Sequence, residues 1–145
     1  MSTISGNSTA AERVAWGRFL WVAPLAIVAS VAANTVVRTI SKAIFSVPDE
    51  FPPFAVGQFT FLTVAGGVGA MATFALVGWL SKRPFRLFNW IAGVVLVLSW
   101  APDILLLVAR PFPGVAVTGV ATLMGMHAMT AGIIVWLLNT QARAK

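Results

Sequence analysis

Four long apolar runs, separated by short breaks, dominate the pattern of hydrophobic and polar positions along the chain. The runs cover about residues 19–45, 54–80, 87–108 and 115–138. A helix that spans a bilayer needs about 20 mostly apolar residues, whereas strands of a membrane barrel need about 9–11 and alternate polar with apolar side chains. Because these runs are longer and do not alternate, the pattern predicts four transmembrane helices and an all-α fold.

The three breaks between the runs are short and contain proline, which cannot continue a helix. Residues 46–53 hold three prolines and two acids, residues 81–84 form a basic turn, and residues 110–114 hold two prolines. Connections this short favour neighbouring helices that lie antiparallel and side by side. We therefore expect residues 1–145 to form one transmembrane domain, an up-down four-helix bundle. A tail at residues 1–15 precedes it, and its first eleven, mostly polar, residues are expected to be mobile.

The composition indicates lipid rather than water around these side chains. Hydrophobic residues make up 59% of the 145 residues and charged residues 10%, whereas a soluble domain carries about 45–50% and about 25%. The chain has no cysteine, which excludes disulfides and thiolate metal sites, and its single histidine cannot supply bis-histidine haem ligation. We expect no cofactor.

The charged residues predict an orientation in the membrane. If the N-terminal tail, the second break and the C-terminal tail share one side, that side holds seven basic residues and one acid. The basic residues are Arg13, Arg18, Lys82, Arg83, Arg86, Arg143 and Lys145, and the acid is Glu12. The other side holds three basic and three acidic residues, so the whole net charge of +6 lies on one face. The positive-inside rule makes this face cytoplasmic and both chain ends cytoplasmic. Because the basic residues flank apolar runs, no nucleic-acid partner is expected.

The first run also resembles a secretory signal peptide. Arg13 and Arg18 precede an apolar core, and small residues follow at positions 29–33. The apolar character nevertheless continues to Phe45, well beyond the core of a cleaved signal. We therefore expect this run to remain as the first transmembrane helix.

A polar stripe marks one face of the first run. Ser30, Asn34, Arg38 and Lys42 are spaced four residues apart, so they lie on one helix face. Arg38 and Asp103 reach similar depths, about 28 Å and about 24 Å from the cytoplasmic ends of their runs. Two interpretations stay open. Arg38 and Lys42 extend to the headgroups, or Arg38 forms an ion pair with Asp103 that holds the first and third helices together.

The third and fourth runs carry further polar groups. Pro102 predicts a kink in the third helix, and Ser99 is placed to bind the backbone carbonyl that the proline leaves free. His127 lies about 18 Å from the outer end of the fourth helix, near the bilayer centre. An interhelical hydrogen bond is favoured for His127, with a proton or ligand role as the alternative. The candidate polar cluster is Asn34, Arg38, Ser99, Asp103 and His127, with no catalytic or metal site expected.

Small residues in the second and fourth runs predict close contacts between helices, because they let two backbones approach. The residues in question are Gly66, Gly67, Gly69, Ala72, Gly125, Ala128 and Gly132.

Two short motifs resemble those of a known family. Residues 97–102 read VLSWAP, and residues 123–130 read LMGMHAMT. A serine–proline stretch in the third helix and a Met-His step in the fourth are similar to a family of small bacterial four-helix membrane proteins of unknown function. The resemblance covers most of the chain and assigns no activity. It favours Ser99, Pro102 and His127 as the positions to test. We expect the protein to lie in the bacterial inner membrane.

These observations favour a role other than catalysis, as an accessory subunit or as a binder of a small ligand or lipid within the membrane. A small proton-coupled transporter with His127 as the titrating residue is the alternative, and it requires an oligomer because four helices rarely enclose a pathway. An intramembrane enzyme acting on lipid is a third hypothesis, but no phosphate loop, paired carboxylates or nucleophile elbow supports it. The expected partners are the lipid bilayer and either further copies of the chain or a larger membrane complex.

Overall fold

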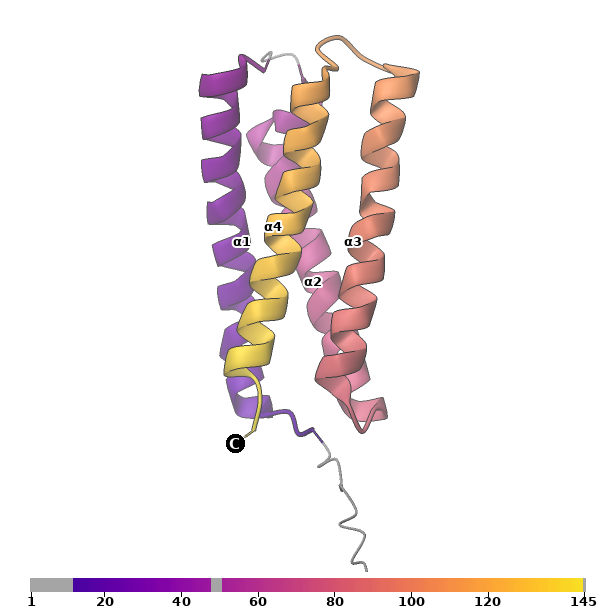
Figure 1. Cartoon of the computed structure of the whole chain (residues 1–145). Helices are drawn as coiled ribbons and strands as arrows, with labels where there is room; N and C mark the ends of the chain where they lie inside the picture. Colours follow the sequence, from indigo (N-terminus) through magenta and orange to yellow (C-terminus); the bar gives the residue numbers. More distant parts are fainter. Residues whose placement is uncertain (1–11, 48–50, 145) are drawn as a thin grey trace, which may run out of the picture.

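The computed structural model describes residues 12–47 and 51–144, and four long helices contain most of them (Figure 1). They are α1 (Trp16–Phe45), α2 (Val56–Leu80), α3 (Pro84–Ala109) and α4 (Val117–Gln141), and a short 3₁₀ helix, η1 (Pro52–Phe54), precedes α2. Each of the four is long and apolar enough to cross a membrane. The prediction of an all-helical chain with four helices of membrane-spanning length is confirmed for the described residues.

The start of α3 differs from the prediction. The sequence pattern places Pro84 in the turn, whereas the structure makes it the first residue of α3. Proline fits there because the first backbone N–H groups of a helix have no intrahelical acceptor and its fixed φ suits the helix. The mobile tail predicted for residues 1–11, and residues 48–50 of the first break, lie outside the described residues.

Figure 1 shows the four helices side by side, with the described start of the chain and the C-terminus at one end and the α1–α2 and α3–α4 connections at the other. We call the first of these the chain-end face. Helix α4 packs extensively against both α1 and α3, and α2 also contacts both of them. Helices α1 and α3 share at most a marginal contact. Side chains of α1 therefore meet α4 and α2 rather than α3.

The core consists of two apolar clusters along the helices. One contains Phe19, Phe74, Phe85, Phe88 and Leu138, toward the chain-end face. The other contains Phe51, Phe54, Phe59, Val120 and Met126, toward the opposite end. Buried polar side chains of α1 lie in the intervening region, so the interior is not uniformly apolar.

Most of the small residues do not mark contacts within the chain. The glycines at which an added Cβ would meet no atom within 4 Å are Gly66, Gly69, Gly125 and Gly132. The close approach that these four positions permit is not made within the described chain, because they face away from its neighbouring helices. It holds for Gly67, where a Cβ would lie 2.8 Å from Cγ1 of Ile27, so α1 and α2 approach closely there.

The segments before α1 and after α4 pair with each other. Val14 and Arg143 form an antiparallel bridge. The Ala15 N–H donates to the carbonyl of Ala142 at 2.8 Å, and the Ala144 N–H donates to the carbonyl of Arg13 at 2.9 Å. Residues 12–15, predicted as part of the tail, are therefore held against the end of α4.

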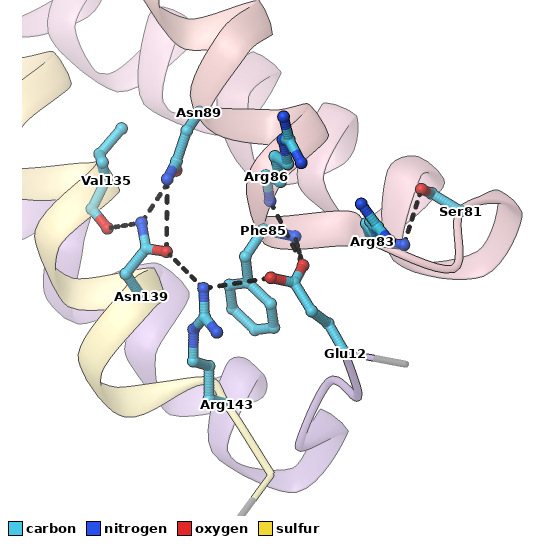
Figure 2. A network of polar contacts seen from close by, with 9 residues as sticks. All are labelled: Glu12, Ser81, Arg83, Phe85, Arg86, Asn89, Val135, Asn139 and Arg143. Atoms are coloured by element: carbon cyan, nitrogen blue, oxygen red, sulfur yellow. Dashed lines mark hydrogen bonds and ion pairs between the residues drawn. The ribbon is translucent and has the colours of Figure 1, made fainter. Parts of the chain in front are cut away.

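Glu12 extends this pairing to α3, as Figure 2 shows. Its carboxylate accepts the N–H groups of Phe85 at 2.9 Å and Arg86 at 3.3 Å, and it lies 3.4 Å from the guanidinium of Arg143. The Arg143 guanidinium also lies over the Phe85 ring, 4.4 Å from its centroid. A single carboxylate thus links both terminal segments to the first turn of α3.

Candidate functional site

A carboxylate–imidazole pair joins α3 to α4 within their membrane-length segments. Oδ2 of Asp103 lies 2.9 Å from Nδ1 of His127. The Asp103 side chain is 9% exposed, whereas that of His127 is 43% exposed, so the pair is covered at the carboxylate and open at the imidazole. Both atoms are buried, and neither forms a hydrogen bond with a described residue, so the two groups meet as a close carboxylate–imidazole contact without hydrogen-bond geometry. Each group therefore depends on the other for its polar contact.

A second contact joins the same two helices. The indole N–H of Trp100 donates to the carbonyl of Met124 at 3.2 Å. Trp100 and Asp103 are three residues apart on α3, as Met124 and His127 are on α4. Residues at this spacing share a helix face. The indole and the carboxylate therefore lie on the same face of α3, which is turned toward α4.

The polar stretch around Pro102 is organised differently from the prediction. Pro102 lies inside α3 and removes the donor that the carbonyl of Leu98 would receive. The hydroxyl of Ser99 donates at 2.7 Å to the carbonyl of Leu96, not to that of Leu98. Ser99 thus contacts its own helix and does not join the Asp103–His127 pair.

Arg38 also lies apart from this pair. Its Nε donates to the carbonyl of Phe54 at 2.6 Å, and its guanidinium lies 5.9 Å from the centroid of the Phe59 ring. The ion pair between Arg38 and Asp103 that depth along the helices allowed does not form among the described residues. The reason is that α1 and α3 are not packed neighbours, whereas α4 packs against α3 and places His127 beside Asp103.

Asn34 connects three helices. Its Nδ2 donates to the hydroxyls of Thr63 on α2, at 3.1 Å, and Thr130 on α4, at 3.0 Å. Asn34 is 2% exposed, and its Oδ1 is buried with no partner in the structure. Thr130 follows His127 by three residues. A second polar layer therefore lies one helical turn from the ion pair.

The polar stripe of α1 is buried in a different register from the predicted one. Ser30 and Asn34 are buried as expected, but the next buried polar residue is Ser41, whereas Lys42 is only partly covered. Ser41 accepts a hydrogen bond from Thr122 of α4 at 3.1 Å. The stripe thus contributes hydroxyl and amide contacts to α4.

Trp100, Thr63 and Thr130 were not predicted as members of the polar layers. The three-residue spacing of Trp100 and Asp103 was a usable signal, because it places both on one face of α3. The two threonines carried no signal, since isolated threonines are ordinary in apolar helices.

The residue types present restrict the chemistry of this site. Within residues 12–47 and 51–144, no three His, Cys, Asp or Glu side chains come together in a group that could hold a metal ion. The Asp103–His127 pair instead supplies an acceptor carboxylate beside an imidazole, which has one donor and one acceptor nitrogen when neutral.

Comparison with known proteins supports the resemblance seen in the two motifs. Neither the curated proteins nor the solved structures contain a match to the chain. A family model described as a family of unknown function, DUF6069, matches residues 10–144. This range includes all four helices. The chain therefore belongs to the DUF6069 family of unknown function.

Proposed function

We propose that this chain is a multi-pass protein of the bacterial inner membrane that binds a small organic cation at the Asp103–His127 pair, in exchange for a proton. In this proposal the four helices run antiparallel across the bilayer, with the chain-end face in the cytoplasm. The observation that carries the proposal is the 2.9 Å contact between a buried carboxylate and a half-open imidazole.

The net charge of the pair supports exchange between a proton and a cation. A carboxylate beside a neutral imidazole carries one uncompensated negative charge, which is costly within a membrane. One proton on the imidazole removes that net charge, and so does one monovalent cation bound beside the carboxylate. The two occupants therefore compete, because each neutralises the same group.

The surroundings favour an organic cation over a hydrated metal ion. The Trp100 ring lies one turn from Asp103, and aromatic faces attract organic cations, most strongly where water is excluded. The polar layers next to the pair consist of neutral hydroxyl and amide groups. Access is expected from the His127 side, because the imidazole is 43% exposed whereas the carboxylate side chain is 9% exposed.

Proton-coupled transport by an oligomer is the second candidate function. The outward glycines of α2 and α4 favour it, because they leave room for another helix to approach closely. The same surfaces would let the chain act as an accessory subunit of a larger membrane complex.

Binding of tetraphenylphosphonium, an apolar organic cation, to the protein in nanodiscs tests the first proposal. Calorimetry in two buffers with different protonation enthalpies measures the affinity and the protons released. We expect about one proton released per bound cation, and we expect Asp103→Asn to remove both binding and release. The matched control is Ser99→Ala, which changes a hydroxyl that contacts only its own helix.

Two results would overturn the proposal. One is wild-type affinity in the Asp103→Asn variant when its helical content is unchanged by circular dichroism. The other is the absence of wild-type binding on both sides of the ordinary titration range of histidine.

A further inference from the structure

The chain-end face carries an excess of exposed positive charge. Its exposed basic residues are Arg13, Arg18, Lys82, Arg83, Arg86 and Arg143. Glu12 is the only acid of the described residues at this face, and its carboxylate is already bound to Arg143 and to two N–H groups of α3 (Figure 2). Among the described residues of this face, one carboxylate therefore stands against several exposed cations.

Two of these basic residues, Arg13 and Lys82, belong to backbone segments that contact each other. The N–H of Glu12 donates to the carbonyl of Lys82 at 3.2 Å, which brings the segment before α1 against the α2–α3 turn. Arg13 directly follows Glu12, so its side chain starts one residue from this contact. Neither the Arg13 nor the Lys82 side chain forms an ion pair or hydrogen bond with other described residues. Two cations without an ion-pair partner among the described residues thus start from adjoining backbone segments.

An exposed pair of indoles lies on the membrane side of these cations. Trp16 and Trp79 have ring centroids 6.0 Å apart in an edge-to-face arrangement, and they are 37% and 78% exposed. Trp16 follows Arg13 by three residues, and Trp79 precedes Lys82 by three.

Gly78 makes this indole pair fit against α2. A Cβ at position 78 would lie 3.0 Å from Cη2 of Trp16 and 3.3 Å from Cγ2 of Val14. The missing side chain therefore lets Trp16 lie directly on α2, where it meets Trp79. Arg13, Trp16, Trp79 and Lys82 together form what we call the basic corner.

We infer that the basic corner binds the headgroup of an anionic phospholipid. Its two cations attract the negatively charged phosphodiester. Juxtamembrane basic residues are attracted to anionic lipids in the same way. Indoles favour the headgroup level of a bilayer, so Trp16 and Trp79 hold the corner at the depth where phosphates lie. A zwitterionic lipid presents a compensating ammonium group and binds more weakly. This inference is independent of the cation site, since the two lie in different parts of the helices.

Native mass spectrometry of the detergent-solubilised protein with phosphatidylglycerol or phosphatidylcholine tests the inference. We expect the wild type to retain phosphatidylglycerol preferentially, and Arg13→Gln and Lys82→Gln each to weaken this binding about five-fold. Arg86→Gln removes a charge at the same face outside the corner, and Arg110→Gln removes one at the opposite end. Both controls are expected to keep nearly wild-type binding.

Other outcomes of this experiment would overturn the inference. Equal losses in Arg13→Gln and Arg86→Gln would show a diffuse attraction to the whole face and overturn the site. Equal retention of both lipids by the wild type would overturn it as well. If inorganic phosphate displaces phosphatidylglycerol at matched concentration, the corner binds free phosphate rather than lipid. Arg13→Lys and Lys82→Arg separate charge from folding, because they preserve the charge and are expected to keep the lipid.

Discussion

Glu12, which precedes α1, accepts the N–H of Phe85 at the start of α3 at 2.9 Å. The first N–H groups of a helix lack intrahelical acceptors and carry partial positive charge. A carboxylate from a distant part of the chain therefore serves as the N-terminal cap of α3. The side chain of the N-cap residue itself, Arg83, makes no capping hydrogen bond.

Replacing this cap is expected to loosen the first turn of α3. Glu12→Ala should lower the free energy of unfolding by about 1–2 kcal/mol, the usual range for loss of a cap. Glu12→Gln keeps an acceptor oxygen and should lose less. Hydrogen exchange of the Phe85 and Arg86 amides measures the local effect. Unchanged exchange in Glu12→Ala would show that the carboxylate does not cap the helix.

The contact between His127 and Asp103 predicts where the proton of a neutral imidazole lies. A carboxylate oxygen lies 2.9 Å from Nδ1, and its negative charge favours a proton on that nitrogen, so the Nδ1–H tautomer is expected to dominate. Because the chain has one histidine, ¹⁵N NMR of selectively labelled protein in nanodiscs reports this residue alone. Asp103→Leu should abolish the preference for Nδ1–H, whereas Ser99→Ala should leave it unchanged. A dominant Nε2–H tautomer in the wild type would contradict the pairing.

Double-mutant cycles distinguish the observed Asp103–His127 pair from the alternative Arg38–Asp103 pair. Asp103→Ala and His127→Ala each remove one member of the same contact, so their effects on unfolding free energy should be coupled by about 1 kcal/mol or more. Asp103→Ala and Arg38→Ala should be additive within about 0.5 kcal/mol, because these residues share no contact. The measurement is reversible unfolding in detergent micelles. Coupling of Asp103 to Arg38 but not to His127 would contradict the helix arrangement.

Adjacent glycines of α2 provide a matched pair for testing which face packs. Gly67→Ala places a Cβ 2.8 Å from Ile27, and such overpacking is expected to destabilise by about 1–3 kcal/mol. Gly66→Ala meets no atom within 4 Å, so the better helix propensity of alanine should leave stability unchanged or slightly raised. Thermal unfolding of both variants compares them directly. Equal destabilisation would contradict the assignment of faces.

Run lengths and prolines were sufficient to predict the four helices, because the bilayer imposes a minimum apolar length on any spanning helix. The partners of each helix were not predictable in this way. Helices that are apolar on all sides have no polar face to indicate which neighbour they meet. Arg38 and Asp103 lie at similar distances from the cytoplasmic ends of their helices, which made them candidate partners. Only the packing of α4 against both α1 and α3 shows that the partner of Asp103 is His127.

The glycines failed as indicators for a related reason. Small residues permit close approach without specifying whether the approaching helix belongs to the same chain. Gly67 meets Ile27, whereas Gly66 and Gly69 face outward. The capping role of Glu12 was also not predictable, since it depends on the bridge between Val14 and Arg143.

The bridge between Val14 and Arg143 gives the chain nearly the connectivity of a closed ring. Glu12, among the earliest of the described residues to be synthesised, completes its contacts only with Arg143, among the last. The first helix can therefore enter the bilayer early, but its final anchoring must wait until the fourth has been translated. We therefore expect this face to assemble late, after insertion of the helices. In a chain interrupted before α4, Glu12 could still cap α3 but would lack its partner Arg143.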